Sequence, residues 1–251
     1  GDVGALAGCC FDLGDPKTGS LQPMSLMAIF AGPSQDRISE FTNNSSSPLH
    51  ARNAKRMFLK ELRRAGIEPS YGGPTIFCIR DGLYALMANH QYGASPINAN
   101  EVSKATLEAR RENHELVRAL HNMGGPWYGS RIVYTAEQIG TREGRRIHGL
   151  YQVTADDLRT GKQFDDAICR VNFGIDVHST DPKKTKEIED RPFRSKPYDI
   201  PLRALIARDV DGLMMAGRCI SGDFLAHSSY RVTGNAVAMG AAAGTTAAIA
   251  S

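Results

Sequence analysis

The chain has 251 residues, and its 30 lysines and arginines against 27 aspartates and glutamates give a formal net charge of +3. This weak charge, spread in doublets such as Arg63-Arg64, argues against a nucleic-acid partner, which would require a basic stripe or run. With 41% hydrophobic and 23% charged residues, the sequence falls outside the disordered and fibrous classes and has the length of one or two globular domains.

The first third of the chain is predicted to contain one strand and one long helix. Residues 1–10 predict a short helical turn, and residues 24–30 predict a strand after a loop rich in Gly, Asp and Pro. Residues 32–48 are polar and include Asn43-Asn44-Ser45-Ser46-Ser47, which predicts an exposed and mobile loop. Ser47 before Pro48 predicts a helix start, and apolar residues three and four apart extend that helix to Gly66.

A β-hairpin is predicted around Asp81-Gly82, because Asp-Gly between two apolar runs favours the positive φ angles of a tight turn. A second long helix is predicted over 101–123, with Asn100 as its N-cap and Gly124-Gly125 as its end. Thr154 predicts a capped helical turn over 154–157. Further strands are predicted at 132–135, 147–153, 168–173 and 211–216. Because strands and helices do not alternate strictly, the predicted fold class is α+β, beside a piece of an α/β lobe.

Metal and membrane partners are not indicated by the sequence. The five cysteines show no C-x-x-C spacing and the seven histidines are scattered, so we expect no metal site and no disulfide framework. Residues 1–10 lack the pattern of a signal peptide, and the small apolar stretch 236–250 is shorter than the roughly 20 residues of a membrane span. The compartment is left open, with the cytoplasm as the default and secretion not excluded.

The C-terminal segment carries the clearest functional pattern. An apolar run, 212–216, leads into Gly217-Arg218-Cys219, and Gly234-Asn235 then opens a helix rich in Ala and Gly. A strand that ends in glycine, followed by a helix with a glycine at its start, can present backbone N–H groups to an anionic or electron-rich ligand. We therefore predict cofactor binding here. Gly240 and Gly244 lie four residues apart and can be explained by close helix packing alone.

This segment resembles the C-terminal signature of a family of bacterial FAD-dependent oxidoreductases. The signature comprises a strand, an AGRCIS turn, an AH-x-S-x-R-V segment and an Ala/Gly-rich helix. EQIGTREGRRIHGLYQVTADD at 137–157 and GDVGALAGCCFDLG with LQPMSLM near the N-terminus agree with the same family, so that the resemblance spans almost the full chain. It implies hydride transfer to flavin from a small polar substrate, of which sugar-derived molecules are examples.

One part of the family pattern is missing. Family members bind FAD mainly through an N-terminal β-α-β unit with a G-x-G-x-x-G turn, which this sequence lacks. We therefore interpret the chain as the C-terminal portion of a flavoprotein, with 1–30 and 198–251 as a remnant of the FAD lobe and 31–197 as a mixed-sheet substrate lobe with the hairpin and both long helices. The N-terminal FAD-binding segment is the expected partner, and FAD is expected to be absent or substoichiometric in this chain alone.

The resemblance implies a set of cofactor contacts at the two ends of the chain. A helix N-terminus or an arginine in this set would stabilise the negative charge of a reduced flavin. For Arg231 an ordinary ion pair, and for Asp2 a helix N-terminal carboxylate, are the alternatives. The implied contacts are Gly1, Asp2, Gly217, Arg218, Arg231, Gly234, Asn235 and Ala236.

Three residues are candidates for contact with the substrate. His227 is a candidate general base or flavin-edge donor, and a structural histidine is the alternative. Arg142 and Arg146, with Arg145 between them, are candidates for binding a carboxylate or vicinal hydroxyls, and structural ion pairs are the alternative. Trp127-Tyr128 could form a sugar-stacking platform or pack in a core. For the whole chain, the alternative function is a non-enzymatic module that binds a carbohydrate or a partner.

Overall fold

The computed structural model describes residues 1–43, 47–190 and 192–250 and divides into two compact units. Unit 1 comprises Gly1–Gln22, Arg142–His178 and Ile188–Ser251, and unit 2 comprises Pro23–Thr141 and Ser179–Glu187. The expected boundaries at residues 30 and 198 do not coincide with this division. Most of the predicted substrate lobe after residue 141 lies in unit 1, together with both chain ends.

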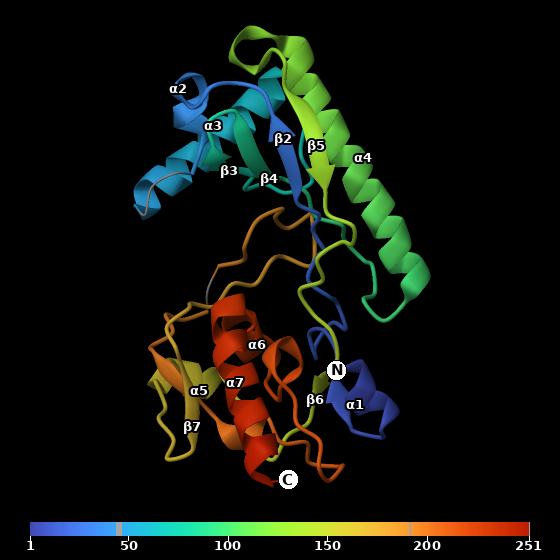
Figure 1. Cartoon of the computed structure of the whole chain (residues 1–251), viewed down its shortest axis with the longest axis vertical. Coiled ribbons are helices and arrows are strands. Elements are labelled where there is room, and N and C mark those ends of the chain that lie inside the picture. Colours follow the sequence, from blue (N-terminus) through green and yellow to red (C-terminus); the bar gives the residue numbers. More distant parts are fainter. Residues whose placement is uncertain (44–46, 191, 251) are drawn as a thin grey trace. The chain divides into compact units, whose positions relative to one another are not determined.

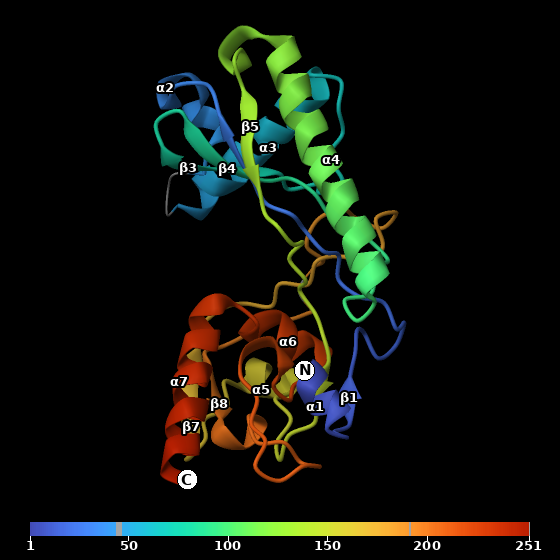
Figure 2. The same cartoon turned by 45° about the vertical axis from the view of Figure 1, so that its right-hand side comes forward.

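Unit 2 is a four-stranded antiparallel sheet with two helices on one face (Figure 1). The strand order is β3-β4-β2-β5, with β2 at Ala28–Ala31, β3 at Thr75–Arg80, β4 at Leu83–Met87 and β5 at Arg131–Thr135. Helices α3 (Pro48–Arg64) and α4 (Ala99–Met123) pack their apolar sides onto the alternate residues of β2 and β4 that are buried (Figure 2). The predicted hairpin is confirmed, with Gly82 at φ 72°. The sheet is antiparallel throughout, where a mixed sheet was expected.

Three local predictions in unit 2 need correction. The strand predicted at 24–30 begins only at Ala28, since Met24 and Ser25 form isolated bridges. Asn98, and not Asn100, caps α4, because its side chain accepts hydrogen bonds from the backbone at positions 100 and 101. The predicted mobile loop contains α2 (Gln35–Ile38) and the 3-10 turn η1 (Ser39–Phe41), which bury Ile38 and Phe41 in the core. Its residues 44–46 lie outside the described part of the chain.

Unit 1 combines short paired strands with helices around one apolar core. Tyr198, Tyr230, Ile147 and Met239 are members of this core. The Thr154 capping box is confirmed at the start of α5. The strand pairs are β1 (Phe11–Asp12) with β6 (Arg146–Ile147) and β7 (Ala167–Val171) with β8 (Tyr198–Pro201). The helical elements are α1 (Asp2–Leu6), α5 (Ala155–Thr160), η3 (Leu202–Ala204), η4 (Gly217–Cys219), α6 (Phe224–Tyr230) and α7 (Thr233–Ala250), and η2 (Gly125–Trp127) belongs to unit 2.

Two strand predictions in unit 1 were too long. Residues 147–153 contribute only the end of β6 to a ladder. Residues 211–212 form a turn, with Gly212 at φ 72°, and the rest of the segment makes one bridge, Ile206↔Met214, with backbone hydrogen bonds to positions 205 and 207. All ladders among the described residues are antiparallel, so the α+β class is confirmed, while a parallel Rossmann-like sheet is not found in that part.

In the described ranges, none of the helices combines the length and apolar character that crossing a bilayer requires.

Helix α7 is uncharged and largely exposed. No Asp, Glu, Lys or Arg occurs in its 18 residues, and of the side chains described in it only that of Met239 is fully buried. Val237 is 69% exposed and Ile249 is 81% exposed. Large exposed apolar side chains on an uncharged helix are a feature of interaction sites.

The glycines of α7 allow a stability prediction. A Cβ atom added at Gly240 or Gly244 meets nothing within 4 Å, so each Gly→Ala substitution should raise the unfolding free energy of the chain by about 1 kcal/mol through helix propensity. Denaturant unfolding measures this change. As a control, Gly222→Ala should lower stability, because its Cβ would lie 2.5 Å from the Tyr230 ring. A loss of stability in Gly240→Ala would contradict the open environment seen here.

Candidate functional site

The structure brings the glycine turn and the start of α7 together. Gly217 begins η4 at φ 74°, and a Cβ atom on it would lie 3.5 Å from Cβ of Ala236. Gly1 packs against the other end of this turn, since its Cβ would lie 3.4 Å from Cβ of Cys219 and 2.6 Å from the carbonyl oxygen of Arg145. Three of the predicted cofactor contacts are therefore neighbours.

The remaining predicted cofactor contacts have different environments. Asp2 lies in the first turn of α1 and also forms an ion pair with Arg145, so its role is not limited to that of a helix N-terminal carboxylate. Gly234 is exposed and has open space around it, while Asn235 donates from its side chain to the carbonyl oxygen of Tyr230 at 3.3 Å. Arg218 is exposed on η4. The backbone N–H groups of Asn235 and Ala236 already donate to the carbonyl oxygen of Val232, so at the start of α7 only positions 233 and 234 can offer theirs to an anionic group.

Two predicted catalytic residues lie in the interior of unit 1. Arg146 is 2% exposed, and it donates from Nε to the carbonyl oxygen of Gly222 at 3.1 Å and from Nη2 to that of Gly14 at 2.9 Å. His227, on α6, is 0% exposed. Burial, followed by the charges of Arg146, Arg231 and Arg218, holds the pKa of His227 well below its usual value, although the Arg218 backbone beside the ring acts in the opposite sense. The imidazole is therefore neutral.

Arg231 forms the ion pair that was its alternative explanation. Its Nη2 donates to the carbonyl oxygen of Asp176 at 2.7 Å and lies 3.4 Å from the Asp176 carboxylate. Burial alone would raise the pKa of Asp176, but hydrogen bonding to His178 and the charges of His178, Arg231 and Arg142 bring it below its usual value. Arg142 is thus part of this electrostatic group, and Asp176 is ionised.

Gln22 and Glu143 belong to the same buried polar cluster as Arg146, His227, Arg231 and Asp176. The sequence analysis did not predict either of them. Gln22 is 3% exposed, and its Nε2 donates to Glu143 Oε1 at 2.6 Å and to Ser228 Oγ at 3.2 Å. Its Oε1 accepts from the backbone N–H of His178 at 2.8 Å. Glu143 lies inside the quoted GTREGRRI motif, but a buried glutamine and a buried glutamate have no sequence pattern that distinguishes them from exposed ones.

Several buried polar atoms of this cluster make no hydrogen bond of ordinary geometry within the described part of the chain. They concentrate in the short segments 143–146 and 227–231 of unit 1. Buried polar groups are normally hydrogen-bonded, so such a concentration indicates a missing partner. The atoms are Glu143 Oε2, Arg145 Nε, Arg146 Nη1, His227 Nδ1, His227 Nε2 and Arg231 Nε.

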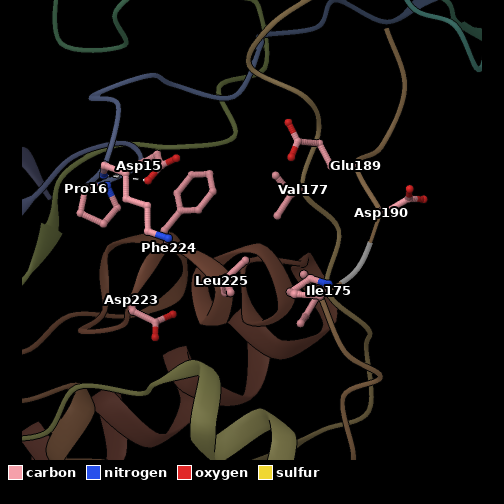
Figure 3. Close-up of a pocket in the computed structure, with 11 residues that line it drawn as sticks. Asp15, Pro16, Ile175, Val177, Glu189, Asp190, Asp223, Phe224 and Leu225 are labelled. Carbon is pink, nitrogen blue, oxygen red and sulfur yellow. Dashed lines mark hydrogen bonds between the residues drawn. The ribbon is translucent and has the colours of Figure 1, made fainter. Parts of the chain in front are cut away.

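A cavity of about 390 Å³ in unit 1 is lined by other residues (Figure 3). Ile175, Val177, Phe224 and Leu225 provide its apolar lining, and none of the predicted site residues lines it. Asp223, which also lines it, caps α6 by accepting from the backbone N–H of Ala226 at 2.8 Å. The cavity therefore carries no catalytic argument.

The aromatic pair in unit 2 does not form a stacking platform. Trp127 is 0% exposed and packs against Phe41 and Phe58, with its Nε1 donating to Glu61 Oε1 at 3.0 Å. Tyr128 is exposed and stacks on His121. Core packing, the alternative explanation, therefore holds for Trp127.

Unit 1 contains a glycine turn, a helix start and buried arginines. This combination is typical of a protein that binds an electron-rich or anionic cofactor. A family model described as FAD dependent oxidoreductase matches residues 1–251, and the chain belongs to this family. Comparisons with the curated proteins and with the solved structures found no match.

The residues present fit the cofactor of this family. Arg146 Nη1 and Arg231 Nε are buried N–H donors without a partner among the described residues. Such donors suit the electron-rich edge of a flavin, which becomes negatively charged on reduction. The first turn of α7, which lies beside Gly217 at Ala236, adds the partial positive charge of a helix start.

Proposed function

We propose that the protein oxidises a small polar substrate at a C–H bond beside a hydroxyl or amine, with FAD as the hydride acceptor. The observation that carries this proposal is a pair of buried guanidinium N–H groups, on Arg146 and Arg231, that have no hydrogen-bond partner among the residues the structure describes. The charge of Arg218, in the Gly217 turn, acts on Arg231. When bound, FAD supplies a two-electron acceptor for the hydride. Sugar-derived molecules are one class of substrate with the required hydroxyl groups.

The cofactor side of the site consists of a positive helix end and an oriented arginine. Gly217 lets the chain turn at a positive φ angle, so η4 approaches the start of α7 closely at Ala236. Asp176 holds Nη2 of Arg231, which leaves Nε as the donor for a ligand oxygen or nitrogen. Arg218 and Asn235 flank this region, and Gly1 and Asp2 close it from the N-terminal side.

The substrate side consists of His227, Arg142 and Arg146. Because the pKa of His227 is far below its usual value, the ring offers one donor and one acceptor nitrogen at neutral pH. Arg146 keeps Nη1 for a ligand, since carbonyl oxygens occupy Nε and Nη2. These groups can orient a hydroxyl-bearing or carboxylate-bearing substrate.

The proposed partner of this chain is an N-terminal β-α-β segment that completes the FAD site. The uncharged, exposed surface of α7 supports this assignment, because a helix next to a dinucleotide-binding sheet requires small apolar residues. Within this proposal, the chain alone binds less than one FAD per molecule, and the same chain preceded by such a segment binds one.

A charge at the start of α7 tests the cofactor assignment. Gly234 has open space around it, so Gly234→Glu should fold normally and gain slightly in stability from the helix dipole. The introduced carboxylate should nevertheless repel FAD and weaken its binding by about tenfold or more, because an opposed charge-assisted contact is worth about 1.5–3 kcal/mol. Flavin fluorescence titration of the protein that carries the N-terminal segment measures this change.

Gly234→Ala is the matched control and should bind FAD as the unchanged protein does. Equal FAD affinity for the Glu and Ala variants would remove α7 from the cofactor site. No flavin absorption from the complete protein would overturn the enzymatic proposal and favour a cofactor-free binding module.

A further inference from the structure

Glu143 is a buried carboxyl group in which one oxygen is hydrogen-bonded and the other has no partner among the described residues. It is 3% exposed, and its Oε1 accepts from Gln22 Nε2 at 2.6 Å. Its Oε2 makes no hydrogen bond with any residue that the structure describes. A carboxyl group fixed in this way presents a single oxygen for proton exchange.

Gln22 links this carboxyl group to the proposed cofactor arginine. Its side-chain amide donates to Glu143, while its Oε1 lies 3.4 Å from Nη2 of Arg231 and accepts from the backbone N–H of His178. Because the amide bonds in both directions, its orientation is fixed. Glu143 and Arg231 are therefore held in a defined arrangement by one side chain.

The charged groups that act on Glu143 are Arg146 and Arg231. Burial raises the pKa of Glu143 above its usual value, while the Gln22 hydrogen bond and the two arginine charges oppose this rise without cancelling it. Asp176 pairs with His178 and with Arg231, and the charge of Arg142 also acts on it. Glu143 is thus the carboxyl group of this cluster whose proton affinity lies nearer to neutral pH.

His227 is less suited to accept a proton. It is completely buried, and the charges of three arginines act on it, so its pKa is well below its usual value. A general base works best when its pKa lies near the working pH. The imidazole is better suited to orienting a ligand through a neutral hydrogen bond.

We propose that Glu143 is the proton acceptor of the oxidation, with Gln22 as its positioning residue. The substrate O–H or N–H bond breaks and its proton goes to Glu143 Oε2. The neighbouring C–H hydrogen leaves with its electron pair to FAD, which is reduced, and a C=O or C=N bond forms in the substrate. This inference rests on the proposed function, because FAD is the oxidant.

The first test needs neither FAD nor substrate and measures the unfolding free energy of the full chain against pH. The ordinary pKa of a glutamate is 4.5 in the unfolded chain, and in the folded chain that of Glu143 is higher. Between the two values only the folded state holds the proton, so stability falls as pH rises through this window. Glu143→Gln mimics the protonated form. It should therefore lose this pH dependence and should be more stable at neutral pH than the unsubstituted chain.

Glu112 provides a matched control in unit 2. Burial also raises its pKa, but its oxygens accept from the backbone N–H and Oγ of Ser70 and from Gln91 Nε2. Because the pKa of Glu112 is also raised, Glu112→Gln is the positive control and should change the pH dependence of stability as Glu143→Gln does. An unchanged pH dependence in Glu143→Gln would show that Glu143 is already ionised and would overturn the proposal.

The second test measures the midpoint potential of FAD against pH in the flavin-loaded protein, which requires no substrate. Negative charge on the reduced flavin should raise the proton affinity of Glu143, so that one additional proton is bound on reduction within a window of pH. Glu143→Gln should lose this proton, whereas Glu112→Gln and His227→Gln should retain it. Retention in Glu143→Gln would overturn the proposal and leave FAD binding intact. Failure of the unsubstituted protein that carries the N-terminal FAD-binding segment to bind FAD would overturn the proposed function itself.

Discussion

Arg231→Leu is expected to lower the unfolding free energy of the chain by about 3–5 kcal/mol, because the substitution leaves Asp176 partly buried without its arginine. The Arg231 side chain is 9% exposed and that of Asp176 is 21% exposed, so water replaces the lost partner poorly. The carbonyl oxygen of Asp176 also loses its donor. Denaturant unfolding at neutral pH measures the loss.

Two further variants separate charge from geometry at this position. Arg231→Lys retains the charge and should recover part of the stability, although it cannot reproduce the planar guanidinium contacts. The double variant Arg231→Leu with Asp176→Asn removes both charges and should be more stable than Arg231→Leu alone. If the double variant showed the simple sum of the two single losses, the ion pair would not be the cause. In the flavin-loaded protein, Arg231→Leu should also lower the reduction potential.

Trp127→Ala should lower the unfolding free energy of the chain by about 3–5 kcal/mol, because it removes the largest fully buried side chain of unit 2 and leaves a cavity. The substitution removes the ring contacts with Phe41 and Phe58 and leaves the buried Glu61 carboxyl without the donor at 3.0 Å. Amide hydrogen exchange and denaturant unfolding together measure the global loss and show where protection is lost. Loss of protection should concentrate in the sheet and helices of unit 2.

The neighbouring Tyr128 serves as the control. It is 74% exposed, and Tyr128→Ala should change stability by no more than about 0.5 kcal/mol. If Tyr128→Ala destabilised the chain as much as Trp127→Ala, the packing described for this pair would be wrong.

The sequence predicted those elements whose formation depends on local residues. The hairpin followed from Asp81-Gly82, and the helical turn after Thr154 followed from its capping box. The segment 211–216 failed as a strand because its first two residues form a turn, and the rest pairs with positions 205–207 through a single bridge. Ladder partners are not encoded locally, so composition overstated this strand.

The candidate site was predictable only in part, for the same reason. Arg146, His227 and Arg231 were predicted because they lie in the two motifs that resemble the family, residues 137–157 and the AH-x-S-x-R-V segment. The structure brings these three side chains into one buried group. The residues that organise this group, Gln22 and Asp176, are separated from them by long stretches of chain. Such long-range hydrogen bonds depend on the complete fold and leave no periodic pattern in the sequence.

The division of the chain also has a consequence for the order of synthesis. The sheet of unit 2 is complete once Thr135 has left the ribosome, because β2 to β5 occupy one continuous stretch. Unit 1 begins earlier but finishes last, since β1 pairs with β6, β7 pairs with β8, and Met239 of α7 completes its core. Residues 1–22 must therefore wait for their long-range partners until β6 has been synthesised, which makes unit 1 the slower unit to assemble and the one more exposed to chaperones.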